Sequence, residues 1–129
     1  MSRISTAFFG VAVLYAIAGM VLGMVMGASQ DFAMRPLHAH INLLGWAGLA
    51  IMGAFYGIAG ARASSRLAWT VFAVSNLGNL LTLAMVYKIS SGQPPIAPVL
   101  VAGEILIVAG MALFGVSVLL AGHKTAAAA

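Results

Sequence analysis

The 129 residues are 63% hydrophobic and 6% charged, with a mean hydropathy of +1.09. A soluble domain carries about 25% charged residues. The composition therefore predicts an integral membrane protein. The net charge of +4 comes from scattered cations and not from a basic patch, which excludes nucleic-acid binding. The chain has no cysteine, which excludes disulfides, iron–sulfur clusters with thiolate ligands and covalent c-type haem.

Four apolar segments follow one another, each near the ~20 residues that span a bilayer as a helix. They cover residues 6–27, 36–60, 67–87 and 98–122. Short connections make consecutive helices antiparallel neighbours. We therefore predict an all-α fold, an integral membrane four-helix up-down bundle that forms a single transmembrane domain over residues 1–129. The terminal alanines, 126–129, are expected to form an unstructured tail.

The cations predict the orientation. One end carries Arg3, Arg62, Arg66 and Lys124, whereas the other carries Arg35, Lys88 and the acidic Asp31. The positive-inside rule then places both termini in the cytoplasm. Within the first two segments, glycines recur every four residues at positions 19, 23 and 27 and at 53 and 57. This spacing favours close helix packing.

The second segment begins with a polar cluster. Arg35 and Pro36 precede His38 and His40, near the outer face in this orientation. Ionisable side chains are costly inside a bilayer, and neutral histidine is the commonest protein metal ligand. Residues two apart on a helix point about 200° away from each other, so the two imidazoles cannot bind one ion. We expect one of them to face the bundle and the other a neighbouring subunit, headgroups or water.

The third and fourth segments carry polar residues at a similar depth. Ser75, Asn79 and Thr82 form one stripe, and Asn79 lies ~12 Å below the outer end of its helix. Glu104 is the one acidic residue in any span, ~9 Å below Pro98. Together with two residues of the second segment, they predict one polar layer in the outer half, formed by His40, Asn42, Asn79 and Glu104.

Simpler roles are open for each residue. His38 can be an interfacial histidine wetted by water, and Asn79 can serve only to join helices. A buried Glu104 has to be protonated, paired or in contact with water. Arg35 can bind a headgroup phosphate or a haem propionate.

These residues resemble a known family. The run His40-Ile41-Asn42-Leu43-Leu44 matches the pattern H-x-N-L-L in helix 2 of haem-copper oxidase subunit I, most closely the nitric oxide reductase catalytic subunit. The run Ser65-Arg66-Leu67-Ala68-Trp69 resembles the entry into helix 3 of the reductase. A competing match, Arg35-Pro36-Leu37-His38, resembles cbb3-type oxidases.

The resemblance implies a prokaryotic inner-membrane protein whose helix 2 supplies an axial histidine to haem b. The first match nominates His40 and the second His38; we favour His40, because its match continues along the helix. Arg35, Asn42, Asn79 and Glu104 are then the candidate residues around the haem. The chain has only three histidines, whereas the family uses six as metal ligands, so it cannot build the dinuclear reducing centre by itself.

We therefore expect a small haem b-binding protein for electron transfer or for binding of a diatomic gas. The haem would lie near the outer face, between subunits of a homo-oligomer, with membrane lipid and a respiratory electron-transfer protein as further partners. Two alternatives are an accessory or assembly subunit of a respiratory complex without a cofactor, and a copper-handling protein that uses the histidines with Met20 and Met24.

Overall fold

The computed structural model describes residues 2–126, and all of its secondary-structure elements over that range are helices. The elements are α1 (Arg3–Ser29), α2 (Arg35–His40), the π-helix η1 (Ile41–Gly48), α3 (Leu49–Ala59), the 3₁₀ turn η2 (Gly60–Arg62), α4 (Ser65–Ser90) and α5 (Ala97–Ala126). The segment from α2 to η2 is one continuous helical rod. The structure therefore contains four helices long and apolar enough to cross a membrane, which confirms the predicted spans.

The helices extend beyond the predicted apolar runs because polar residues cap them. The Ser2 hydroxyl accepts a hydrogen bond from the backbone N–H of Ser5 at 3.3 Å, at the start of α1. Ser64 does the same for the N–H of Leu67 at 3.5 Å, at the start of α4. A side-chain cap satisfies backbone donors that have no partner within the helix, so a helix can begin before its apolar stretch does. The remainder of the expected terminal tail lies outside the described residues.

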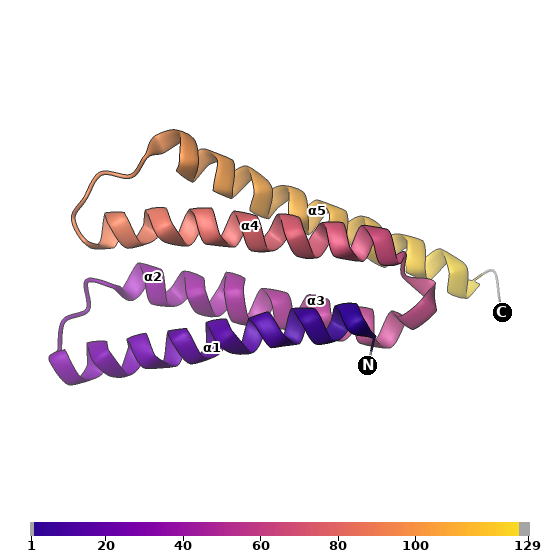
Figure 1. Ribbon diagram of the computed structural model, residues 1–129, viewed down its shortest axis with the longest axis horizontal. Helices are drawn as coiled ribbons and strands as arrows, with labels where there is room; N and C mark the ends of the chain where they lie inside the picture. Colours follow the sequence, from indigo (N-terminus) through magenta and orange to yellow (C-terminus); the bar gives the residue numbers. More distant parts are fainter. Residues whose placement is uncertain (1, 127–129) are drawn as a thin grey trace.

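The molecule is built from two antiparallel hairpins. One pairs α1 with the rod formed by α2, η1 and α3, and the other pairs α4 with α5. Consecutive rods alternate in direction, so both ends of the chain lie at the same end of the molecule (Figure 1). We call this end the terminal end and the other the loop end. The hairpins meet where α2 and η1 contact α4, and where α3 contacts α5.

A cluster of aromatic rings joins the hairpins toward the terminal end. Phe8 of α1 is completely buried and stacks on Tyr56 of α3, with the ring centroids 5.4 Å apart. The same phenyl ring meets Phe72 of α4 edge to face at 5.0 Å. Tyr56 donates a hydrogen bond to the Ser117 hydroxyl of α5 at 3.0 Å. All four spans thus contribute to one core.

Small residues allow the helices of each hairpin to pack closely. Ser5 donates a buried hydrogen bond to the carbonyl oxygen of Gly53 at 2.8 Å. A Cβ at Gly53 would lie 2.9 Å from Phe8, and one at Gly57 would lie 3.0 Å from the Ser5 hydroxyl. The predicted packing role of the glycines is confirmed for positions 19, 23, 53 and 57, but Gly27 has nothing within 4 Å of the Cβ position.

The polar stripe on α4 is buried. Ser75, Asn79 and Thr82 are 5%, 3% and 3% exposed. Ser75 and Thr82 lie against glycines of α5: a Cβ on Gly110 would be 2.5 Å from the Ser75 hydroxyl, and one on Gly103 would be 2.6 Å from that of Thr82. The stripe is therefore part of the tight contact between α4 and α5, which the sequence analysis placed correctly on one face but did not pair with these glycines.

Candidate functional site at the loop end

His38 is enclosed between α2 and α1. Its imidazole lies over the backbone of Gly23, where a Cβ would be 3.0 Å from Cε1. The Asn42 amide donates to the His38 carbonyl oxygen at 2.8 Å and lies 3.5 Å from Nε2. Nδ1 of His38 is buried and has no hydrogen-bond partner in the described part of the chain. Both ring nitrogens thus face into the contact between the two helices.

His40 is held differently. Its Nδ1 lies 2.7 Å from the carbonyl oxygen of Pro36, one turn back in the same helix. A carbonyl oxygen only accepts, so Nδ1 carries the proton and Nε2 carries the lone pair. No described residue forms a hydrogen bond with Nε2. A histidine that donates one N–H to a backbone carbonyl and leaves the other nitrogen free is the usual arrangement of a metal ligand.

The rod changes helix type immediately after His40. Residues Ile41–Gly48 form a π-helix, with wider turns than the α-helices on either side. Such segments are rare and occur frequently at functional sites. The Asn79 amide donates to the carbonyl oxygen of Leu44, within this π-helix, at 3.1 Å. Asn79 therefore joins α4 to η1, which is the interhelical role that the sequence left open for it.

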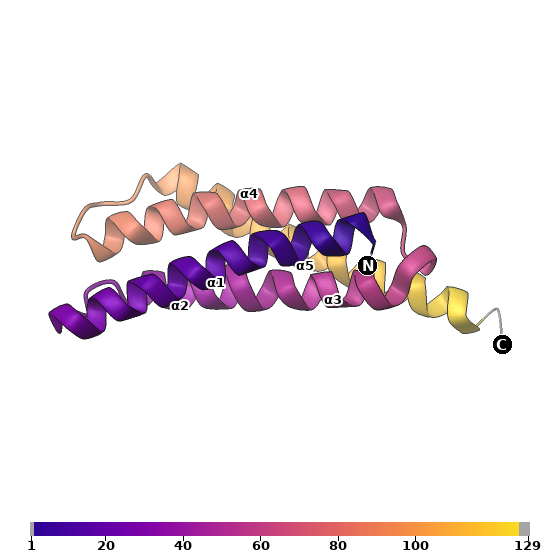
Figure 2. The same cartoon turned by 60° about the horizontal axis from the view of Figure 1, so that its bottom comes forward.

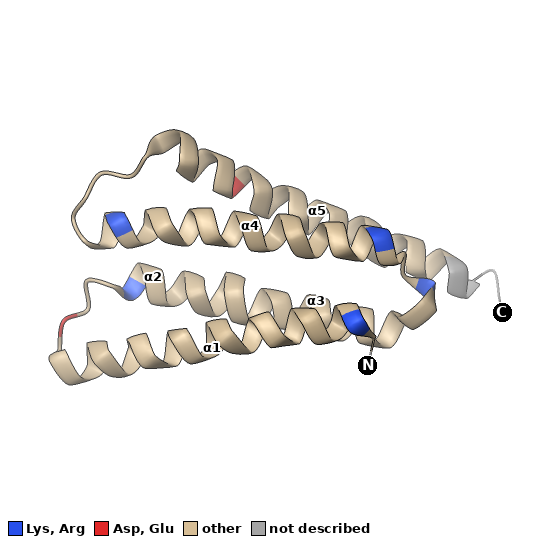
Figure 3. Cartoon of the chain, viewed as in Figure 1, with Lys and Arg blue, Asp and Glu red and all other residues tan. Residues whose placement is uncertain are grey.

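The four residues of the expected polar layer are not hydrogen-bonded to one another in the described part of the chain. Asn42 is turned toward α1, where a Cβ on Gly19 would be 2.6 Å from its amide nitrogen, and its partner is His38 and not His40. Glu104 is exposed on α5, within the body of the helix (Figure 3). Among the described residues, no hydrogen bond connects any two of His40, Asn42, Asn79 and Glu104. The similar depths follow from helix rise, but the directions of the side chains differ.

Arg35 lies at the rim of this region, one turn before His38. Its guanidinium carbon is 4.5 Å from the centre of the Phe32 ring, a cation–π contact that keeps the charge at the surface. Arg35 is exposed, so its N–H groups remain accessible to an anion from outside the chain.

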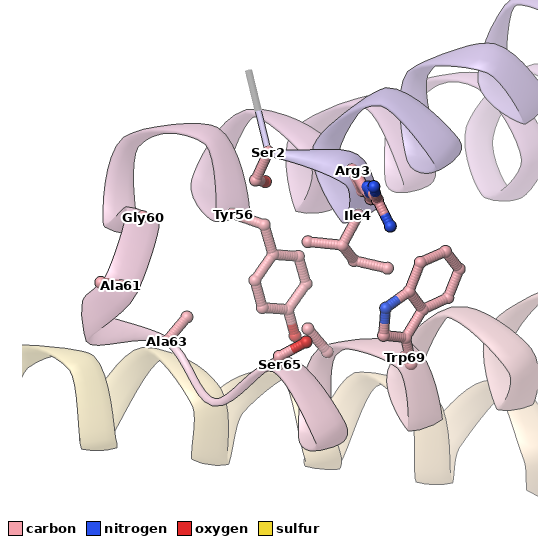
Figure 4. Close-up of a pocket in the computed structure, with 10 residues that line it drawn as sticks. Ser2, Arg3, Ile4, Tyr56, Gly60, Ala61, Ala63, Ser65 and Trp69 are labelled. Carbon is pink, nitrogen blue, oxygen red and sulfur yellow. The ribbon is translucent and has the colours of Figure 1, made fainter.

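The hollows of the structure were not predicted from the sequence. A small one of about 70 Å³ lies between η1, α4 and α5, lined by Leu44, Met52 and Asn79 among others. A larger one of about 550 Å³ lies at the terminal end, among the starts of α1 and α4 and the end of α3. Figure 4 shows Arg3 and Trp69 on one side of this second hollow and Tyr56 on the other. The sequence did contain a signal for this hollow, because Arg3 and Trp69 each lie near the start of a span at the same predicted end.

Comparisons with protein-family models, with curated protein sequences and with solved structures found no match for this chain. Within the described residues there is also no group of three or more histidine, cysteine, aspartate or glutamate side chains that could hold a metal ion. The arrangement at the loop end therefore offers single imidazole ligands: His40 with a free Nε2 and His38 with both nitrogens enclosed.

Proposed function

We propose that this chain is a multi-pass membrane protein that binds haem b through His40. The observation that supports this most strongly is the hydrogen bond from His40 Nδ1 to the Pro36 carbonyl oxygen, which leaves Nε2 as an electron-pair donor. His40 begins the H-x-N-L-L run that resembles helix 2 of haem-copper oxidases, and it directly precedes the π-helix. We place this end of the molecule at the outer face of a prokaryotic inner membrane.

The residues present fit a haem better than a bare metal ion. A porphyrin supplies four nitrogens to its iron, so the protein has to add only one or two axial ligands, which matches isolated imidazoles. His38 is the less suitable ligand, because its ring is enclosed between Gly23 and Asn42 and would have to leave that contact. Arg35 at the rim can pair with a propionate by charge-assisted hydrogen bonds.

The position of His40 favours a haem shared between chains. Neither His38 nor His40 is among the residues that line four hollows of about 70 to 550 Å³ along the described helices. A second copy related by a two-fold axis would bring an equivalent histidine to the opposite side of the porphyrin. When bound, haem b supplies a one-electron redox centre or a site for a diatomic gas. Within that site the chain would hold the iron at Nε2 of His40, fix the ring through Pro36 and anchor a propionate at Arg35.

A second candidate function is supported by Glu104. A carboxyl group exposed on the body of a membrane helix is costly in lipid unless it is neutral, paired or hydrated. A protein partner that covers α5 would remove that cost. In this case the chain would be an accessory subunit of a respiratory complex, and its histidines would serve only in packing and hydrogen bonds.

Absorption spectra of the purified protein distinguish these functions. We expect a Soret band, a sharp reduced α band and a pyridine haemochrome typical of haem b. A preparation that stays colourless after reconstitution with hemin would contradict the haem proposal and favour the accessory role. Copper found by elemental analysis without a Soret band would instead favour metal handling.

The choice of ligand can be tested with a matched pair of variants. His40→Ala should abolish the low-spin spectrum, because the free Nε2 is lost, whereas His38→Ala should largely preserve it. Circular dichroism on both variants would confirm that the helices are retained. Loss of the spectrum in His38→Ala alone would assign the iron to the enclosed histidine and contradict our choice.

A further inference from the structure

The hollow at the terminal end and an apolar groove lie one after the other along α1 and α4. Trp69 lines the hollow and Phe72, one turn further along α4, lines the groove. The two rings touch edge to face with centroids 5.6 Å apart, so they form a continuous wall. The groove has a volume of about 490 Å³, and α1 lines it as far as Ala18. We refer to the hollow and the groove together as the furrow.

This furrow exists because α1 and α4 belong to different hairpins. They contact each other in few places and diverge toward the loop end (Figures 1 and 2). Phe8 of α1 is buried between these two helices and contacts Phe72 of α4. From Arg3 to Ala18 the helix rises ~22 Å at 1.5 Å per residue. That length exceeds one leaflet, which is about half of the ~30 Å hydrocarbon core.

The two parts of the furrow differ in chemistry. The hollow contains a guanidinium group from Arg3, an indole N–H from Trp69 and the hydroxyl of Ser65. The groove is lined by aliphatic and aromatic side chains with one amide, that of Asn76. Among the described residues, Arg3 is the one arginine that lines the hollow, and neither acidic residue of the chain lies at this end. The head of the furrow is therefore electropositive and its tail is apolar.

We propose that this furrow binds one anionic phospholipid, with its phosphate in the hollow and an acyl chain in the groove. Arg3 would bind the phosphate through charge-assisted hydrogen bonds, and Trp69 would lie at the level of the headgroup. Basic hollows between helix ends are suited to anionic headgroups. A neutral lipid or a quinone would fill the same groove but would leave the guanidinium without an anion. This inference is independent of the haem proposed at the opposite end.

Quenching of Trp69 fluorescence tests this site. The chain has two tryptophans, so Trp46→Phe leaves Trp69 as the only emitter. The protein would be reconstituted in phosphatidylcholine vesicles with a minor fraction of brominated phosphatidylglycerol, and separately with the same fraction of brominated phosphatidylcholine. We expect stronger quenching by the anionic lipid, and no such preference in Trp69→Phe, where Trp46 emits from η1. Equal quenching by both lipids would overturn the proposal.

Two matched pairs of variants test the head and the tail of the furrow. Arg3→Gln should weaken binding of phosphatidylglycerol about fivefold to tenfold, whereas Arg66→Gln, exposed at the same end and outside the hollow, should preserve it. An equal loss of phosphatidylglycerol binding in both variants would mean that only the general surface charge matters, and it would overturn the proposed site. Ala18→Phe should block the groove, and Ala112→Phe, exposed on α5, should not.

Competition distinguishes the source of the ligand. Glycerol 3-phosphate has the headgroup anion without acyl chains, and we expect that it does not displace the brominated lipid. Displacement by glycerol 3-phosphate would show that the groove contributes nothing. Displacement by a long-chain quinone at the same concentration as unlabelled phosphatidylglycerol would also contradict an anionic lipid as the ligand.

Discussion

The two ends of the bundle are stabilised by different means. Toward the terminal end, Phe8, Tyr56 and Phe72 interlock, and the hydroxyls of Ser5 and Tyr56 have partners at 2.8 and 3.0 Å. Toward the loop end, polar side chains pack directly against glycines, as Asn42 does against Gly19 and His38 against Gly23. The buried polar atoms without a partner in the described residues are His38 Nδ1, Thr82 Oγ1 and Ser90 Oγ, and all three belong to the loop-end half.

This difference supports our choice of the loop end for the proposed haem site. A buried polar atom without a hydrogen bond is costly, and native proteins keep few of them. Departures from good packing concentrate at functional sites. The same half also contains the π-helix and His40, whose Nε2 has no hydrogen-bond partner among the described residues. The terminal end contains the aromatic core beside the proposed lipid site, and the loop end is where we propose the haem.

The largest change in the free energy of unfolding is expected from a substitution at the terminal end. Phe8→Ala removes a completely buried ring that contacts α3 and α4, and should lower the free energy of unfolding by about 3 kcal/mol. Denaturant titration in detergent micelles would measure it, with Leu14→Ala on the exposed face of the same helix as the control. A loss no larger than that of the control would mean that the aromatic cluster does not anchor the bundle.

A smaller effect is expected from crowding in the π-helix. A Cβ at Gly45 would lie 2.4 Å from Cγ of Tyr15, close to where the ring is attached, so the ring cannot easily move aside. We expect Gly45→Ala to destabilise the fold by about 1–2 kcal/mol. Gly10→Ala is the control, because nothing lies within 4 Å of that Cβ position, and alanine favours helix more than glycine does. Equal thermal stability of the two variants would show that the first hairpin is looser than its contacts indicate.

The smallest effect is expected from the amide that joins the hairpins. Asn79→Ala removes the hydrogen bond to the Leu44 carbonyl oxygen and should cost about 0.6 kcal/mol, the average for such bonds in membranes. Asn76→Ala removes a bond to Phe72 of its own helix and leaves the helix contact intact. The same denaturant titration compares the two. A larger loss in Asn76→Ala would contradict the assigned role of Asn79.

The spans and the buried stripe were predictable because they follow from regularities of the sequence. Hydropathy over ~20 residues identifies a span, and the spacing of Ser75, Asn79 and Thr82 places them on one helix face whatever the packing. The i, i+4 relation between His38 and Asn42 was also present in the sequence, although we grouped Asn42 with His40. The structure instead pairs Asn42 with His38.

Other features depend on how the helices rotate against one another. Depth along a helix follows from its rise, but the direction of Glu104 depends on which face of α5 packs on α4. Gly103, the preceding residue, takes that face against Thr82, and Glu104 is exposed. The π-helix was equally unpredictable, because no residue type in Ile41–Gly48 marks it. The hollow around Arg3 needed the three helix ends to be brought together in space.

The seam between α1 and α2 has a consequence for how such a chain can diverge. Gly19 faces Asn42 and Gly23 faces His38, in register along two neighbouring helices. A side chain gained at either glycine would have to be matched by a smaller residue across the seam. Among homologous sequences, we therefore expect positions 19 and 42 to vary together, and likewise positions 23 and 38. The residue found in α1 would then indicate which polar residue the neighbouring helix carries.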